Sequence, residues 1–251
     1  MADEVRQFLE SSAGTNRIIT KDDIQRLPDP VQRNLRYTGV VGRRRINTVR
    51  LKQKGLFKMK QGRKWMPYTA LQYFTTDPPG FVWQARVKAA PLFWISGRDM
   101  YYGGKGSMKI KLWSFIRIVN AAGPKLDQGA MLRYMSEIIW FPTAYLSDYI
   151  TWEAVDENSA KATMIYGGVS ASAILRFDED GRLIEFVADR YMGTGDKATL
   201  EKWTTPVREY AEMSGLQIPV KGEAIWNLAS GDFSYVDLEI TDIEYDNPTK
   251  Y

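Results

Sequence analysis

The chain has 251 residues, of which 44% are hydrophobic and 25% charged, and its formal net charge is +4. This composition is typical of a globular protein with a sizeable core. No apolar run reaches the roughly 18–20 residues of a membrane-spanning helix, and the chain as given does not open with a Sec-type leader. The charge excess is too small to indicate a nucleic-acid partner.

Two residue types are missing from the sequence, Cys and His. The lack of Cys excludes disulfides, thiolate nucleophiles and cysteine-bound metals. The lack of His removes the usual general base and the commonest transition-metal ligand. We therefore expect no metal and no cofactor. Catalysis would depend on carboxylate, Lys, Tyr or Arg side chains, so the composition favours a binding protein over an enzyme.

The first 45 residues are predicted to be a helical segment that packs on a sheet. Residues 3–10 fit a short helix, and Thr20 fits the N-cap of a second one. A third helix is predicted to begin at Asp29–Pro30 and to end at Gly39, because proline suits a first helical position and glycine suits the residue after a helix.

From residue 46 the apolar period changes to two, which predicts a long antiparallel strand with one wet face. The apolar face consists of Val49, Leu51, Gly55, Phe57 and Met59. The basic face consists of Arg50, Lys52, Lys54, Lys58 and Lys60. Such a basic face is either a solvated surface that discourages edge pairing or a contact with an anionic membrane surface.

Further alternating segments predict about ten strands in all. They lie at 70–76, 81–89, 94–102, 108–119, 150–156, 160–166, 169–192, 205–213, 218–228 and 233–245. The sequence DEDG at 178–181 predicts a hairpin within one of them. We expect an α+β, mostly β, fold over 46–251: a single domain with a large curved antiparallel sheet, an open half-barrel, whose concave face is covered by helices.

The segment 126–146 interrupts the strands with a helical pattern that is apolar nearly all round. Pro142 is expected to end or kink this helix, because proline lacks a donor and clashes with the preceding turn. Arg133 and Glu137 stand four residues apart and are predicted to form an ion pair on the helix. The helix is expected to close the half-barrel, with or without space beneath it.

Three blocks carry a resemblance to a known family: LPDPVQRNLRYTGV, GPKLDQGAMLRYMSEIIWFPTAYL and FDEDGRLIEFVADRY. They resemble a family of bacterial and archaeal proteins grouped as a domain of unknown function, and the resemblance covers most of residues 27–246. It implies no activity. In its series of strands and its covering helix the chain is also similar to the LolA-like lipoprotein-carrier fold, which implies an unclosed barrel with a hydrophobic cavity for acyl chains.

Small and aromatic residues alternate on several strands, as around Ala171 and Ala173. These alanines leave room for an apolar ligand, or else they let the 126–146 helix pack closely on the sheet. Arg98 and Arg190 each stand on a strand face with apolar neighbours, so each needs an internal acid or an anionic ligand head as partner. The expected ligand-binding residues are Trp83, Trp94, Arg98, Met135, Trp140, Met164, Ala171, Ala173, Arg190 and Trp226.

Catalytic candidates are few, and no known catalytic motif is present. Glu137 and Asp189 are the carboxylates we name, because their apolar neighbours could raise the pKa; Asp99 and Glu223 have similar surroundings.

Three functions follow from these features. The first is a binding protein for a fatty acid or lipid-like molecule in a half-barrel cavity. The second is a cofactor-free enzyme in the same cavity, with a buried carboxylate and Tyr or Arg. The third is a structural or interaction protein without a ligand. The expected location of the chain as given is the cytoplasm; the alternatives are a peripheral position on a membrane and a protein whose upstream N-terminal anchor is missing from this chain.

Overall fold

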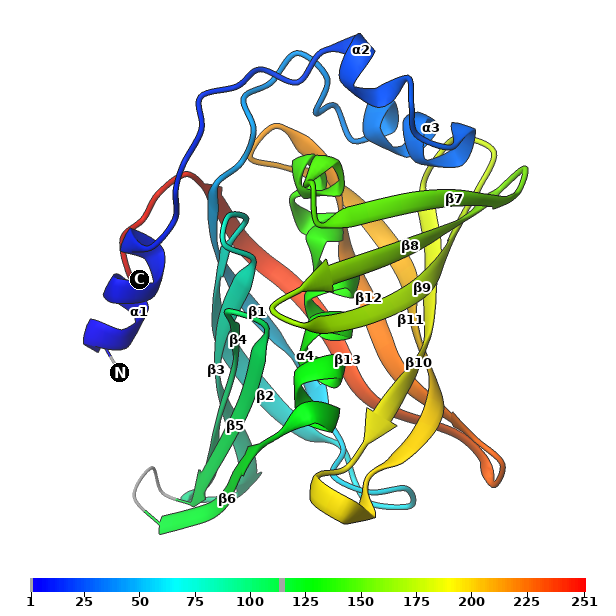
Figure 1. The fold of residues 1–251 in the computed structure, drawn as a ribbon. Helices are drawn as coiled ribbons and strands as arrows, with labels where there is room; N and C mark the ends of the chain where they lie inside the picture. The colour runs from blue at the N-terminus through cyan, green and yellow to red at the C-terminus, as the bar shows by residue number, and fades with distance from the viewer. Residues whose placement is uncertain (1, 113–115) are drawn as a thin grey trace.

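The computed structural model describes residues 2–112 and 116–251, and one antiparallel sheet of 13 strands dominates it (Figure 1). This confirms the prediction of a mostly β chain built on one large antiparallel sheet. The strands are β1 (Thr48–Phe57), β2 (Met66–Thr75), β3 (Gly80–Ala90), β4 (Phe93–Tyr102), β5 (Lys105–Leu112), β6 (Ile116–Ala122), β7 (Ile150–Asp156), β8 (Ser159–Tyr166), β9 (Val169–Phe177), β10 (Leu183–Met192), β11 (Thr199–Met213), β12 (Leu216–Leu228) and β13 (Gly231–Tyr245).

The strand count exceeds the expected ten partly because the segment 108–119 is not one strand. It contributes to β5 and to β6, which pair with each other, so that Ser107 stands opposite Ala122. The alternation of apolar and polar residues continues through both strands, and no glycine or proline marks a turn between them. Residues 113–115, on which part of the expected strand falls, lie outside the described residues.

The order of strands in the sheet is β6-β5-β4-β3-β2-β1-β13-β12-β11-β10-β9-β8-β7. Strands β1 to β6 form one meander, and β7 to β13 form a second that returns to the first. The first strand pairs with the last, and Val49 stands opposite Tyr245. The segment between the meanders therefore connects the two edge strands, β6 and β7, and crosses the open side of the sheet.

That crossing segment is α4 (Pro124–Glu137), followed by the 3-10 helices η1 (Ile138–Trp140) and η2 (Pro142–Leu146). Proline at the first position and Asp127 in the first turn suit the start of α4. Pro142 cannot continue an α-helix and instead begins η2. The helix lies within the curve of the sheet and contacts β5, β9 and β10 (Figure 1).

Two glycine turns join the meanders on the side opposite the β1–β13 pair. Gly103 and Gly104 end β4, Gly167 and Gly168 end β8, and all four have positive φ. A Cβ atom on Gly104 would lie 2.7 Å from the Cα atom of Gly167. Glycine tolerates both this backbone conformation and this approach, so the β4–β5 and β8–β9 turns contact each other at this point.

The helix α1 (Ala2–Glu10) packs on the outer face of the sheet. Its Val5, Phe8 and Leu9 form an apolar cluster with Tyr73 and Val82. Those two residues alternate with inward-facing neighbours on β2 and β3, so α1 and α4 lie on opposite faces of the sheet. We expected helices on the concave face; α1 lies outside it because β2 and β3 are apolar on both faces.

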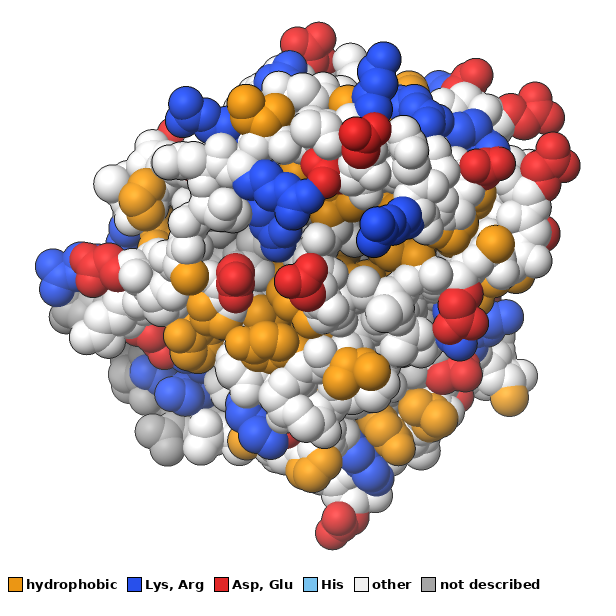
Figure 2. All heavy atoms as spheres, turned by 45° about the horizontal axis from the view of Figure 1, so that its top comes forward, with side chains coloured by type: hydrophobic (Ala, Val, Ile, Leu, Met, Phe, Trp, Pro, Cys, Tyr) orange, Lys and Arg blue, Asp and Glu red, His pale blue; other side chains and the backbone are white. Residues whose placement is uncertain are grey.

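The helices α2 (Lys21–Ile24) and α3 (Asp29–Tyr37) cover one end of the sheet (Figure 1). Thr20 and Asp23 form a capping box at the start of α2. The Asn34 amide donates to the carbonyl of Gly181 across 2.7 Å and fixes α3 on the β9–β10 turn. On the face that includes this end, basic and acidic side chains are interspersed (Figure 2).

Candidate functional site

A cavity of about 350 Å³ lies between α4 and the concave face of the sheet. Its helical wall is one stripe of α4 and η1, formed by Leu126, Gly129, Arg133, Glu137 and Trp140. The spacing of three and four residues places these side chains on a single face of a helix. The opposite wall comes from β1 to β5 and from β10 to β13.

Period-two alternation explains the sheet wall. On β3, Trp83, Ala85 and Val87 line the cavity, and on the adjacent β4, Ile95 and Gly97 do so. Aromatic rings on some positions and glycine or alanine on others leave a space that small side chains do not fill. The wall is mostly apolar, as in sites that bind small molecules, which have volumes of about 300–1,000 Å³.

An ion-paired cluster interrupts this apolar wall. The Arg133 guanidinium donates to the carboxylate of Asp99 across 2.7 Å and to that of Glu137 across 2.9 Å. The latter contact confirms the predicted pair on the helix. Arg133 also lies over the rings of Phe81 and Trp83, at 4.9 and 4.7 Å from their centres. Two carboxylates and two rings therefore hold this cation in place.

A chain of hydrogen bonds extends the cluster across the sheet. The Gln72 amide donates to Glu137 across 2.7 Å, the Gln53 amide donates to Gln72 across 2.9 Å, and the Trp83 indole donates to Gln53 across 3.0 Å. Gln53 and Gln72 are buried on neighbouring strands. Each acceptor in this chain is thereby matched by a donor, as buried polar groups require.

Burial raises the pKa of both carboxylates. It raises the pKa of Asp99 above its usual 3.8, and Arg133 opposes this rise. Burial likewise raises the pKa of Glu137 above 4.5, again against the effect of Arg133. Desolvation therefore dominates at both positions, and both acids depend on Arg133 for their charge.

A second cation, Arg190, has a different environment. Its Nε donates to the carbonyl of Gly129 across 2.9 Å, and its Nη1 lies 3.4 Å from the Tyr235 hydroxyl. Its guanidinium lies over the rings of Trp203 and Trp226, at 4.5 and 5.4 Å. No carboxylate of the described residues forms an ion pair with it. Arg190 thus lines the cavity as a fixed cation, and these contacts do not use all of its N–H donors.

Five of the residues predicted to form the site line the cavity. They are Trp83, Glu137, Trp140, Arg190 and Trp226. The first four approach from β3, α4, η1 and β10, and Trp226 approaches from β12. The indole of Trp140 donates to the carbonyl of Pro219 across 3.1 Å, which fixes its ring as part of the wall.

Four predicted ligand-binding residues lie outside the cavity wall, in the core between α4 and the sheet. Met135 lies on the other face of α4, and Met164, Ala171 and Ala173 are buried on β8 and β9. The small side chains of these strands accommodate the helix rather than a ligand. Of the two interpretations given to the alanines, close packing of the helix fits their position.

Trp94, Arg98 and Asp189 also lie elsewhere. Arg98 forms an ion pair with Glu4 of α1 on the outer face. Trp94 lies on the same face of β4, beneath Arg86 and Lys88. Asp189 is exposed, because it alternates with inward-facing neighbours on β10. The expectation that Asp189 is a buried carboxylate is wrong for this reason.

The site also contains residues that the sequence patterns did not single out. Gln53 and Gln72 stand at inward positions of β1 and β2, where a polar residue among apolar ones is an available signal. Trp203 and Tyr235 complete the environment of Arg190. Their roles depend on the pairing of β10 to β13, which no local pattern reveals.

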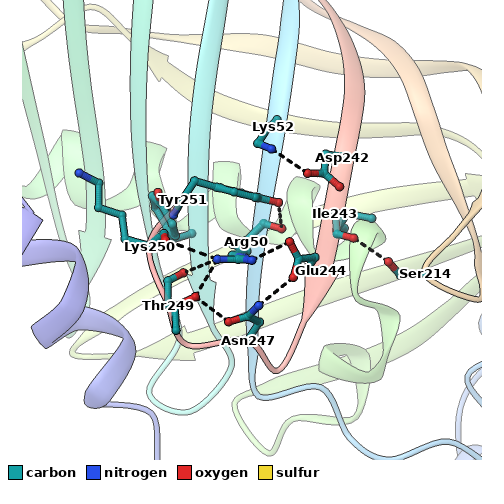
Figure 3. Close-up of polar contacts among 11 residues, drawn as sticks. Arg50, Lys52, Ser214, Asp242, Ile243, Glu244, Asn247, Thr249, Lys250 and Tyr251 are labelled. Carbon is teal, nitrogen blue, oxygen red and sulfur yellow. Dashed lines mark hydrogen bonds and ion pairs between the residues drawn. The ribbon is translucent and has the colours of Figure 1, made fainter.

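The basic stripe on β1 is largely neutralised by the neighbouring strand β13 (Figure 3). Three of its five members form ion pairs there, and the pairs are Arg50–Glu244, Lys52–Asp242 and Lys54–Glu239. The ring of Tyr251 covers Arg50 and Lys52 at 4.4 and 4.1 Å. These three side chains are therefore engaged within the protein, and only Lys58 and Lys60 extend beyond the paired region.

Within residues 2–112 and 116–251, no cluster of three or more acidic side chains is arranged to hold a metal ion. In the same residues, no helix combines the length and the apolar character that crossing a membrane requires.

Comparisons with known proteins give a family for the chain. A crystal structure of a DUF1329 family protein from Desulfovibrio piger is similar with a TM-score of 0.48 and 11% identity, and the match covers 94% of this chain and 96% of that one. A LolA superfamily protein from Nitrosomonas europaea is similar with a TM-score of 0.47 and 9% identity, over 86% of this chain and 91% of that one. No curated protein matches. The family of unknown function DUF6544 matches residues 17–238, which confirms the predicted grouping, and the chain belongs to this family.

Proposed function

We propose that the protein binds an amphiphilic molecule with an apolar chain and an anionic head, such as a fatty acid, in the cavity beneath α4. The observation that carries the proposal is the pairing of a mostly apolar cavity with one cation, Arg190, that has no carboxylate partner among the described residues. A chain of methylene groups is stabilised by leaving water for such a wall, by about 0.8 kcal/mol per group.

Arg190 supplies the anchor for the head group. The rings of Trp203 and Trp226 pack against its guanidinium plane, and its Nε donates to the carbonyl of Gly129. The remaining donors suit a carboxylate or phosphate, which guanidinium groups bind with two parallel hydrogen bonds. The anion would therefore lie near Arg190 and the chain along Trp83, Val87 and Ile95.

The cofactor-free enzyme is less well supported by the same geometry. Two of the three cavity carboxylates, Asp99 and Glu137, are bonded to Arg133, and Glu137 also accepts from Gln72. The third, Glu223, forms an ion pair with Arg208 and accepts from the Ser234 hydroxyl. A general base needs a carboxylate oxygen that can reach the substrate. The cluster instead has the contacts of a structural ion pair, which keeps one cation and two anions inside the protein.

The first test is native mass spectrometry of the purified protein, together with analysis of an organic extract. The second is titration of the lipid-free protein with a long-chain fatty acid and with the alcohol of the same length, followed by Trp fluorescence. Loss of one hydrogen bond to a charged group costs about 1.5–3 kcal/mol. We therefore expect Arg190→Gln to weaken binding of the acid by at least about tenfold and to leave that of the alcohol unchanged.

Two variants complete this test. Arg176→Gln is the matched control, because Arg176 is exposed and pairs with Glu185 on the neighbouring strand, away from the cavity. Gly97→Leu fills the cavity, since a Cβ at Gly97 meets only the Trp83 ring, at 3.5 Å, and should abolish binding of both ligands. A protein that binds neither ligand, or that loses both equally in Arg190→Gln, contradicts the proposal.

A further inference from the structure

The cavity reaches one end of the sheet, which we call the mouth: the loop 58–65, the β3–β4 turn around Leu92, the loop 193–198 and the β12–β13 turn at 229–230. The strand register places these segments together. Phe57 pairs with Met66 at the base of the first loop, and Lys88 pairs with Trp94 at the base of the turn. Ser230 lies within 3.5 Å of Gln61 and joins the last turn to the first loop.

Large apolar side chains project at the mouth. Met59 is 54% exposed, Leu92 is 86% exposed and Phe93 is 42% exposed. Met59 also lines the cavity. The apolar wall of the cavity therefore extends to the exposed side chain of Met59, and Leu92 and Phe93 add exposed apolar surface at the same end. Such a combination marks an interaction surface rather than an ordinary solvated end.

The same side of the mouth is basic. The loop 58–65 carries Lys58, Lys60, Arg63 and Lys64 and no acid, and the segment 86–94 carries Arg86 and Lys88 and no acid. In the part of the chain that the structure describes, none of these six forms an ion pair, in contrast to Arg50, Lys52 and Lys54 of the same sheet region. Lys58 lies 4.1 Å from the centre of the Trp65 ring.

The other side of the mouth carries charges of both signs. Asp196 and Lys197 are neighbours in the loop 193–198, and Asp232 follows the β12–β13 turn, where it accepts from Asn227 across 2.9 Å. The positive excess thus lies on the side of the first meander, beside the exposed tips Leu92 and Phe93. The end that carries α2 and α3 has no such segregation (Figure 2).

We propose that the mouth docks on an anionic lipid bilayer, with Met59, Leu92 and Phe93 in the headgroup region and the basic loop 58–65 against the lipid phosphates. Apolar side chains next to lysines and arginines are the combination that binds such surfaces. Trp65 and Trp94 lie beside the basic residues, where indole rings suit the interface between water and lipid. In this orientation the cavity opens toward the bilayer.

Docking of this kind does not require that the cavity be occupied, so it can be tested apart from ligand binding. The experiment is flotation of the full chain with phosphatidylcholine vesicles, with and without phosphatidylglycerol. We expect binding only with the anionic lipid, and a decrease as salt is raised. Each basic side chain near the surface contributes about fivefold in affinity.

The main variant replaces Lys58, Lys60, Arg63 and Lys64 by Gln, and we expect its affinity for the anionic vesicles to fall more than about a hundredfold. A matched variant replaces the same number of exposed cations at the α2–α3 end, namely Lys21, Arg26, Arg36 and Arg44, and should retain most of the binding. Leu92→Gln with Phe93→Gln should weaken binding at least about tenfold, because these tips no longer enter the headgroup region.

Three results would overturn the proposal. The first is equal binding to vesicles with and without phosphatidylglycerol. The second is equal loss in the two four-charge variants, which would show that only net charge matters. The third is retention on a polyglutamate matrix without binding to anionic vesicles, which would assign the mouth to an acidic protein. The mouth variants are also tested for fatty-acid binding without vesicles. This measurement distinguishes a loss of membrane docking from a loss of ligand binding in the cavity.

Discussion

The two faces of α4 are both buried, but they are buried in different ways. One face, with Met131, Tyr134 and Met135, packs into the core, where the helix contacts β5 and β9. The other face, with Gly129 and Arg133, borders the cavity. A single helix therefore separates a filled layer from a hollow one.

The strands opposite each face account for the difference. On β9 the inward positions include Ala171 and Ala173, which let the helix approach closely. On β3 and β11 they include Trp83 and Trp203, whose rings lie against the two arginines and keep the helix at a distance. Large side chains here hold the helix away from the sheet and leave a space, whereas small ones let the helix and the sheet pack together. The combined volume of the facing side chains sets the distance between them.

The largest expected effect concerns the cation on the hollow side. Arg133→Met leaves Asp99 and Glu137 buried without their partner, and removal of one member of a buried ion pair costs about 3–5 kcal/mol. We expect a loss of that size in the free energy of unfolding, measured by urea denaturation. Arg190→Met, which leaves no carboxylate unpaired among the described residues, should lose less.

The variant Asp99→Asn/Arg133→Met/Glu137→Gln removes all three charges and should recover most of the stability lost by Arg133→Met. If Arg133→Met costs less than about 1 kcal/mol, the value of an exposed pair, the cluster is solvated and the cavity is open to water.

A smaller effect compares two glycines on neighbouring strands. A Cβ at Gly106 of β5 would lie 2.6 Å from the carbonyl oxygen of Leu126 on α4, whereas at Gly97 of β4 it has room. Gly106→Ala should therefore lower the free energy of unfolding by about 1–3 kcal/mol, and Gly97→Ala should change it by no more than about 0.5 kcal/mol. Thermal and urea unfolding measure both; equal losses would mean that the filled and hollow sides are not distinct.

The third effect is a pH dependence on the hollow side. Since the pKa of Glu137 is raised above 4.5 by burial, the folded protein holds this proton more tightly than the unfolded chain. The associated stability is fully present below pH 4.5 and is lost as the pH rises through the raised pKa. Glu137→Gln abolishes this titration, so its stability relative to the original protein should improve as the pH increases over that window.

Urea midpoints measured at a series of pH values test this expectation, and Asp99→Asn should act in the same direction, because the pKa of Asp99 is raised for the same cause. If the difference in free energy of unfolding between Glu137→Gln and the original protein does not vary with pH, Glu137 stays ionised throughout.

Local patterns predicted most of the elements of the fold. The period of two located the strands, Thr20 located the start of α2, and Pro30 and Gly39 located α3, although Pro28 rather than Asp29 stands at its N-cap. The pairing of β1 with β13 was beyond such patterns, because it joins residues at opposite ends of the chain. The position of α1 was also beyond them, since strands that are apolar on both faces do not reveal which face a helix covers.

The same ambiguity limited the prediction of the site. Alternation places Trp94, Arg98 and Met100 on one face of β4, and that face is the outer one, where α1 and Glu4 cover part of it. Arg190 shares its face with Phe186 and Ala188, and this face is turned inward. Which face is concave depends on the curvature of the whole sheet, and this is a property of all the strands together.

The β1–β13 pair has a consequence for the order of folding. The first meander can form its own hairpins as soon as β6 is made, but β1 remains an unpaired edge until β13, close to the C-terminus, has left the ribosome. Until then the sheet has no continuous concave surface, and the apolar faces of α4 have no complete partner. Closure of so long a loop is slow and exposes aggregation-prone edges. The β1 edge therefore stays unpaired on one side until residues 231–245 have been synthesised.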